Sequence, residues 1–322
     1  MATPIPFVRD IEARYGESDV VSPRVRRVLA HNPHPFTYLG TGTYLIGHGE
    51  VAVIDPGPDD AEHVEAVLRA LEPGEHITHL LITHTHSDHS GAVSALQERT
   101  GAPSYGYGPH GTAADPEPPA PFVFGDAEAD GTDRPTRPDE PREGADRSFT
   151  PDITLRHGDV VADEGWTLEA VHTPGHASNH LCYALAEEQL LCTGDHVMGW
   201  STSVIGPPDG DLGAYLGSLE LLLARDDGWY LPTHGPAVTA PRPLVEAFLA
   251  HRRERSEQIL GVLADGPATI TEIVPQLYAD VSKRLWQGAG ASVWAHVLAL
   301  AEAGELGPDE GELTRFARLR RR

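Results

Sequence analysis

The strongest chemical signal in the sequence is a short run of imidazole and carboxylate groups at residues 84–89, HTHSDH. Neutral imidazole and carboxylate are preferred ligands of Zn²⁺. Two histidines that are two positions apart on an extended loop can face one ion. Asp88 and His89, at the turn into the next segment, can face a second ion close by. The segment therefore predicts a metal centre with room for two ions.

Further ligands should come from loops that follow other strands, because sites in α/β folds lie beyond the carboxyl ends of the strands. Three such positions follow in the chain, in the segments HTPGH (172–176), TGDH (193–196) and PTHG (232–235). Each has Gly or Pro beside the candidate ligand, and these residues permit a tight turn. The predicted ligands are His84, His86, Asp88, His89, His176, Asp195 and His234.

The elements that must position these residues alternate between strand and helix. Short β-prone runs at 36–55 (two strands and a turn), 79–83, 153–155, 166–173, 180–184, 189–193 and 229–232 predict strands. Apolar periodicity predicts helices at 59–71, 91–100 and 212–224. This alternation favours an α/β layered fold.

The chain is long enough for one large domain and a small one. We expect the large domain at residues 1–242 and a small, mainly helical domain at 243–322. The second domain is predicted to contain helices at 244–263, 268–279 and 293–303, with a short β-ribbon near 315–319.

Residues 111–152 differ in composition from the rest of the large domain. They are rich in Pro, Asp, Glu and Gly and contain few large apolar residues. Such a segment cannot bury much surface, so we expect an extended surface insertion. The alternative is a functional lid over the site, which residues 122–124 (Phe-Val-Phe) would anchor.

Composition restricts the possible partners and the cellular location. The net charge of −24 opposes the capture of phosphate backbones, so nucleic acid is not an expected partner. Two cysteines, Cys182 and Cys192, are too few for a disulfide framework and are predicted to be buried thiols of a reducing compartment. No apolar run could span a bilayer and no secretory signal is recognisable, so we expect a cytoplasmic protein without a membrane partner.

Taken in order, the motifs THTHSDHSG, HTPGH, TGD and PTHG resemble the metallo-β-lactamase superfamily over about residues 36–236. The resemblance implies an αββα sandwich with the site at one edge. It also implies how the ligands divide. By that pattern, two zinc ions would be held by His84, His86 and His176 on one side and by Asp88, His89 and His234 on the other, with Asp195 between them.

The chemistry implied is hydrolysis by a hydroxide that two zinc ions share, since two such ions lower the pKa of a bound water. Asp88 would be the catalytic group that orients this hydroxide or takes its proton. Asp55 and Thr83 are candidates for fixing the ligand tautomers, and His180 for contacting substrate or supporting the ligands. Iron or manganese could replace zinc, because His and Asp ligands suit several divalent ions.

The tail from residue 243 resembles the winged-helix domain of the lactamase-β-like-2 group. Its expected recognition segment, residues 292–302, contains no Arg or Lys. We therefore interpret this domain as structural: it would shape the substrate rim or support a homodimer.

The leading functional hypothesis is hydrolysis of a small-molecule ester, thioester or lactone-like substrate. A single-strand endoribonuclease is the alternative, because the same site could cleave phosphodiesters, although the negative charge opposes it. A weak β-lactamase side activity is a further alternative.

Overall fold

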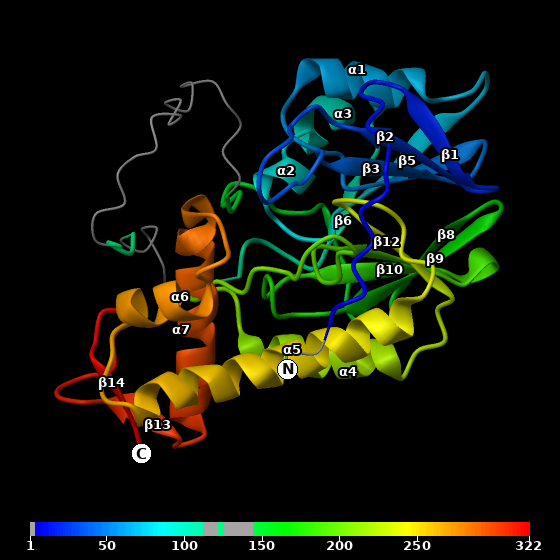
Figure 1. The fold of residues 1–322 in the computed structure, drawn as a ribbon. Helices are drawn as coiled ribbons and strands as arrows, with labels where there is room; N and C mark the ends of the chain where they lie inside the picture. Colours follow the sequence, from blue (N-terminus) through cyan, green and yellow to red (C-terminus); the bar gives the residue numbers. More distant parts are fainter. Residues whose placement is uncertain (1–3, 112–120, 125–143) are drawn as a thin grey trace.

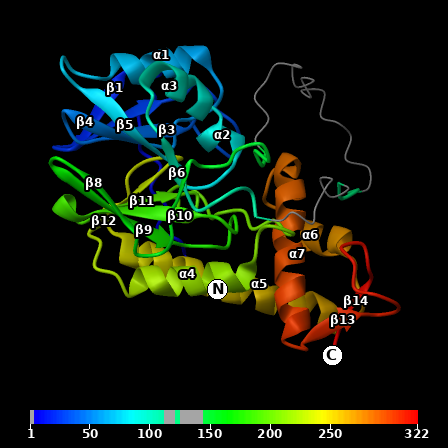
Figure 2. The same cartoon turned by 180° about the vertical axis from the view of Figure 1, so that it is seen from behind.

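The computed structural model describes residues 4–111, 121–124 and 144–322. Within these residues two β-sheets lie face to face, and helices cover the outer face of each (Figures 1 and 2). The order of layers is helix, sheet, sheet, helix, as the predicted αββα sandwich requires. Most of the predicted insertion at 111–152 lies outside the described residues.

The first sheet has seven strands whose spatial order follows the sequence. The first four are antiparallel neighbours, and the last three continue the sheet in parallel. The strands are β1 (Ser18–Ser22), β2 (Val25–Leu29), β3 (Gly42–Ile46), β4 (Glu50–Ile54), β5 (His76–Leu81), β6 (Ser104–Gly106) and β7 (Ile153–Thr154).

The second sheet has five strands in the order β12, β11, β10, β9, β8. Only the β11–β12 pair is parallel. The strands are β8 (Val160–Asp163), β9 (Trp166–His172), β10 (Leu181–Leu185), β11 (Leu190–Gly194) and β12 (Trp229–Pro232). Cys182 on β10 and Cys192 on β11 are buried free thiols, as predicted.

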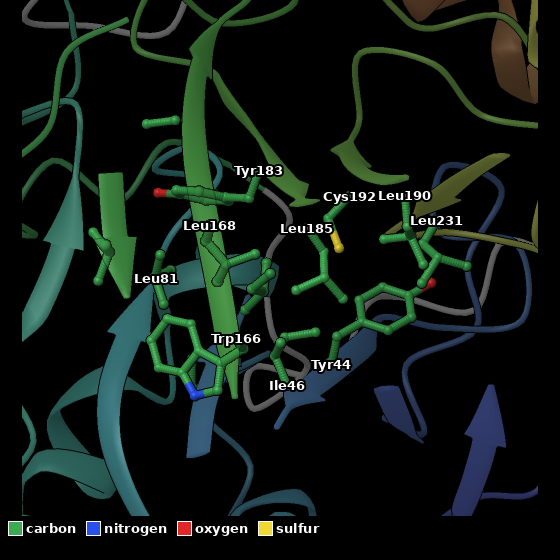
Figure 3. Packing of buried hydrophobic residues seen from close by; sticks show 14 of the residues in the cluster. Tyr44, Ile46, Leu81, Trp166, Leu168, Tyr183, Leu185, Leu190, Cys192 and Leu231 are labelled. Carbon is green, nitrogen blue, oxygen red and sulfur yellow. The ribbon is translucent and has the colours of Figure 1, made fainter. Parts of the chain in front are cut away.

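The two sheets enclose the main apolar core, which Figure 3 shows from close by. Tyr44 and Ile46 of the first sheet face Leu185 of the second sheet there, and the Trp166 side chain lies beside them. Trp166 donates its indole N–H to the Glu50 carbonyl at 2.8 Å. The turn between β3 and β4 passes close to this ring, since a Cβ at Gly47 would lie 2.2 Å from Trp166 Cδ1.

Helices α1 (Ala61–Arg69) and α3 (Val93–Thr100) cover the first sheet, and a single-turn helix, α2 (Ser87–Ser90), precedes α3. Asp60 caps α1 by accepting from the Glu62 N–H, which satisfies one of the unpaired donors of the first turn. Helix α4 (Leu212–Leu223) and the first half of α5 (Pro241–Ala264) cover the second sheet. The predicted helices at 59–71, 91–100 and 212–224 are therefore present, with shorter bounds.

Helix α5 belongs to two cores. Leu244 and Phe248 pack against the second sheet, whereas Ile259 and Leu263 pack in a separate C-terminal core. That core also contains α6 (Ile270–Leu277), α7 (Trp286–Glu302), and the ribbon of β13 (Leu306–Pro308) and β14 (Leu319–Arg321). Short 3₁₀ turns occupy Ala186–Glu188 and Lys283–Leu285. The predicted domain boundary at 242–243 falls inside this continuous helix.

Two bounds in the C-terminal region differ from the sequence prediction. Helix α7 begins at Trp286 rather than at residue 293, and the ribbon pairs residues 306–308 with 319–321 rather than lying at 315–319. Phe122 of the insertion packs into this core as well, and Phe124 packs against it. The backbone N–H and carbonyl of Phe122 both bond to the Gln287 side chain. No helix in the described ranges is long and apolar enough to cross a membrane.

Candidate metal centre

The predicted ligands lie in segments that follow four strands, at one edge of the sandwich. The segment 84–89 follows β5 and runs into α2, His176 lies between β9 and β10, Asp195 follows β11, and His234 follows β12. A bridge between Thr41 and His234 joins the two sheets at this edge. The structure therefore brings together all seven residues from four separate segments.

Three imidazoles converge at one side of the cluster. His86 Nδ1 lies 2.8 Å from His84 Nε2 and 3.2 Å from His176 Nε2. Burial, and after it the neighbouring imidazoles, lower the pKa of His84 well below its ordinary value; burial and His176 lower the pKa of His86 to about 3. Both rings are therefore neutral at pH 7, the form in which imidazole binds a metal ion.

Asp88, His89 and His234 form the second group. Asp88 Oδ2 lies 3.2 Å from His234 Nε2 and 3.5 Å from His89 Nε2. Burial alone would raise the pKa of Asp88, but His89 and His234 outweigh it and lower the pKa to about 2. Asp88 is therefore an ionised carboxylate at neutral pH.

Asp195 lies between the two groups. One oxygen, Oδ1, is 3.4 Å from His234 Nε2 and 3.6 Å from His89 Nε2. The other, Oδ2, is 3.8 Å from His176 Nε2. The two oxygens of one carboxylate thus face two different sets of ligands.

The donor set fits divalent cations on two counts. Buried polar atoms are normally paired, yet His89 Nε2 and Asp195 Oδ1 are buried without a hydrogen-bond partner among the described residues. Burial opposes a charge on His89, but Asp88 and Asp55 outweigh it and raise its pKa well above the ordinary value. The site therefore favours positive charge between these groups, and each of His84–His86–His176 and Asp88–His89–His234 has its ligand atoms within 4.8 Å of one another.

Asp55 fixes the orientation of the His89 ring from the side opposite the cluster. The carboxylate is fully buried; Oδ1 accepts from the Thr83 N–H at 2.8 Å, and Oδ2 accepts from the hydroxyls of Thr83 and Thr233 at 2.9 and 2.6 Å. The same Oδ2 lies 2.8 Å from His89 Nδ1. Because a carboxylate only accepts, His89 carries a proton on Nδ1. The second proton, which the raised pKa favours on Nε2, is the one that a bound metal would displace, and Nε2 would then present a lone pair to the cluster.

His180 supports Asp195 and does not itself join the cluster. Its Nε2 accepts from the Asp195 N–H at 3.2 Å, while Nδ1 lies 2.9 Å from the Thr173 hydroxyl. Gly194 makes this contact possible: its φ is +51°, and a Cβ there would lie 2.5 Å from His180 Nε2. His180 was predicted either to contact substrate or to support the ligands, and this contact with Asp195 favours the supporting role.

The loop at residues 203–204 supports two ligands at once. The Val204 carbonyl accepts from His176 Nδ1 at 2.6 Å. The Ser203 hydroxyl donates to the Asp195 carbonyl at 2.6 Å. Nothing in the sequence singled out this loop, because it contributes a backbone carbonyl and a common serine.

The cluster opens into a cavity of about 580 Å³ between the sandwich edge and the C-terminal helices. His86, Asp88, His176, Asp195 and His234 all line it. The opposite wall comes from α5, from residues near the end of α6, and from α7, with the N-terminal segment at the side. Aromatic side chains in this lining are Phe7, Phe36, Trp200 and Tyr278.

Comparison with known proteins identifies the family of the chain. The family model described as metallo-beta-lactamase superfamily matches residues 38–234. The chain belongs to the metallo-β-lactamase superfamily. It is therefore a hydrolase of this fold, and its His/Asp cluster lies within the part of the chain that the family model matches.

Relatives in the superfamily include fungal proteins. The chain is 32% identical to an atrochrysone carboxyl ACP thioesterase of Aspergillus chevalieri, over 82% of this chain and 77% of that protein. A lactamase-like protein of Aspergillus niger is 30% identical, over 84% and 77%. A beta-lactamase domain protein from Burkholderia ambifaria shares the fold with a TM-score of 0.75 and 23% identity, over 97% of this chain and 96% of that chain. This shared fold includes the C-terminal helices.

Proposed function

We propose that the chain is a dinuclear metal-dependent thioester hydrolase. The observation that carries the proposal is that five of the seven cluster residues line the same cavity as several aromatic side chains. An apolar acyl group fits such a lining, and its thioester carbonyl would then face the cluster. The relatives from Aspergillus chevalieri and Claviceps purpurea that are called ACP thioesterases support this substrate class.

Two zinc ions are the proposed cofactors. We assign His84, His86 and His176 to one ion and Asp88, His89 and His234 to the other, with one oxygen of Asp195 toward each. When bound, such ions supply a nucleophile from water near neutral pH and polarise a carbonyl oxygen. Iron or manganese would satisfy the same ligands.

Residues of the chain would orient the attacking water and hold the acyl group. Hydrolysis forms a C–O bond from water to the carbonyl carbon and breaks the C–S bond, releasing an acid and a thiol. Asp88, ionised and open to the cavity, can accept a hydrogen bond from the attacking water and so fix its direction. The aromatic wall holds the acyl chain and excludes other water from the reacting carbon.

The first experiment measures metal content by mass spectrometry on protein purified without chelator. The same preparation is tested for turnover of a thioester, a lactone, a β-lactam and a short single-stranded RNA. Two metals per chain with thioester turnover is the expected result. Two metals with cleavage of RNA alone would overturn the thioesterase proposal in favour of the endoribonuclease.

Asp88→Asn tests the role of the carboxylate. The amide has the same shape but lacks the negative charge that holds and orients the water, so kcat should fall by about 10²- to 10⁴-fold, the range for loss of a positioned acid–base group. Metal content must be measured beside kcat, since Asp88 is also a proposed ligand. A variant with full kcat would show that Asp88 does not direct the water.

A further inference from the structure

Two arginines of α5 line the same cavity. Arg252 and Arg255 are one turn apart, and both are part of the cavity wall. Arg252 is only 4% exposed. In the part of the chain that the structure describes, neither guanidinium forms an ion pair, and the Nε of each is buried without a hydrogen-bond partner.

The contacts that these arginines do make are with neutral groups. Arg252 donates to the Ser203 carbonyl and lies over the Tyr215 ring. Arg255 donates to the Leu277 carbonyl at 3.1 Å and lies over the Tyr278 ring at 4.2 Å. A guanidinium has five N–H donors. Among the described residues, a backbone carbonyl and a ring face therefore leave the Nε of each guanidinium, and its charge, without a partner.

Arg253, between them, shows the ordinary arrangement. Its side chain is 66% exposed and lies 3.5 Å from Glu220. The surface position has an acidic partner, whereas for the two cavity positions the described part of the chain supplies none. Because a buried charge without a partner is destabilising, the cavity positions are those where an anionic ligand would stabilise the protein.

The two charges also act on the imidazoles beside them. Burial, followed by Arg252 and Arg255, lowers the pKa of His251 to about 4. The same three causes, in the same order, lower the pKa of His296 well below its ordinary value. His251 and His296 are therefore neutral, so the positive charge on this face of α5 comes from the two arginines.

The arginine pair is close to the proposed catalytic centre. Arg252 contacts the carbonyl of Ser203, whose hydroxyl donates to the Asp195 carbonyl. The next residue, Val204, accepts from His176. Arg252 therefore contacts the loop that supports two of the proposed metal ligands. The arginines and the metal centre line one cavity, so one small molecule can contact both.

We propose that Arg252 and Arg255 bind a carboxylate carried by the acyl group of the substrate. The proposal rests on the thioester hydrolase function. A planar guanidinium pairs with carboxylate through two parallel hydrogen bonds. The phosphate of a carrier arm would offer similar chemistry, but it lies many bonds beyond the sulfur, whereas the arginines lie beside the loop that holds the reacting end.

The test compares two N-acetylcysteamine thioesters, which contain no phosphate. One carries a meta-carboxybenzoyl group and the other a meta-acetylbenzoyl group, which has nearly the same shape without the charge. Wild-type kcat/KM should favour the carboxylate by about 10- to 100-fold, the range for a charged hydrogen bond in a buried site. In Arg255→Gln the ratio should fall toward one, and in the matched control Arg253→Gln it should stay at the wild-type value.

A wild-type ratio near one, with good turnover of both thioesters, would overturn the subsite and leave the thioesterase standing. If Arg255→Gln slows coenzyme A thioesters regardless of the acyl group but spares N-acetylcysteamine thioesters, the bound anion is phosphate and the carboxylate assignment is wrong. Arg252→Gln is a second variant, used after its metal content and circular dichroism match the wild type.

Calorimetric binding of isophthalate to the metal-loaded protein needs no turnover, so it tests the subsite even if no thioester is hydrolysed. Arg255→Gln should weaken binding by about tenfold or more, and Arg253→Gln should not. Equal affinity in wild type and Arg255→Gln would refute the subsite. Absence of turnover with intact isophthalate selectivity would instead refute the thioesterase.

Discussion

Replacing Asp55 by Asn should weaken metal binding at the group that contains His89, although Asp55 touches no metal in our assignment. The substitution preserves shape, and Asn tolerates the φ of +50° at this position as well as Asp does. The amide oxygen can replace Oδ1 and accept from the Thr83 N–H. The amide NH₂ then faces the three partners of Oδ2, which are the hydroxyls of Thr83 and Thr233 and the Nδ1 of His89.

The two hydroxyls can rotate and accept, but His89 can accept only by moving its proton from Nδ1 to Nε2. That nitrogen then no longer offers a lone pair to the cluster. Loss of such a supporting contact lowers metal affinity by about 10- to 100-fold, which is about 1.4–2.7 kcal/mol. If the proton stays on Nδ1, a buried donor is left unpaired, and the metal-free protein loses about 1–3 kcal/mol of unfolding free energy.

Competition titration of zinc against a chelator measures the first effect, and urea unfolding of the metal-free protein measures the second. Asp152→Asn is the matched control. Its exposed carboxylate also accepts three hydrogen bonds, from Gln97 and from the backbone and hydroxyl of Ser104, but far along the chain from the cluster. Wild-type affinity for both zinc ions together with wild-type stability in Asp55→Asn would refute the tautomer argument.

Two further predictions concern the centre and the pH dependence of stability. Asp195→Ala should leave the fold largely intact and lower metal content, because its two oxygens face both groups of ligands; mass spectrometry showing wild-type stoichiometry would exclude the bridging role. Burial lowers the pKa of His63 to about 4 from 6.5, so the unfolded chain binds a proton here before the folded protein does, and the stability present above pH 6.5 is lost as the pH falls toward 4. Between pH 7 and pH 5 this linkage is worth about 2 kcal/mol of unfolding free energy. Urea unfolding of the metal-free protein at the two pH values measures the decrease, which should be smaller by that amount in His63→Gln. An unchanged decrease would show that His63 is not the group responsible.

The seven cluster residues could be predicted as candidates because they lie in segments that follow strands, and these strands are plain in the apolar pattern. The supporting contacts were only partly accessible. Asp55 and Thr83 are near the motifs in sequence, and their contacts with His89 and with each other follow from adjacent strand ends. Thr233 and Ser203 act through a hydroxyl that any surface threonine or serine also has, so only the three-dimensional arrangement reveals them.

Strands β1, β2, β6 and β8 were not predicted, and the start of helix α7 was missed. For β2 and α7 the reasons can be identified. Strand β2 has two arginines at its centre, which obscure the strand pattern; Arg26 is nevertheless buried, since it pairs with Glu75 at 2.8 Å. The start of α7 contains Gly288 and Gly290, which disfavour a helix. A Cβ at these positions would lie 3.2 Å from a Phe36 ring atom and 2.6 Å from a Phe122 ring atom. Tertiary packing of aromatic rings thus accounts for the glycines that concealed the helix.

The continuity of α5 bears on how specificity could be separated from catalysis. Its first turns pack on the second sheet, its middle turns present Arg252 and Arg255 to the cavity, and its last turns belong to the C-terminal core. From Phe248 to Arg255 a helix rises about 10 Å, so a rigid element sets the spacing between the sandwich and the arginine pair. The strand-end loops hold the groups proposed for hydrolysis, while α5 and the C-terminal helices form the opposite wall. Substitutions on that wall should therefore change which acyl group is accepted while leaving the metal ligands in place.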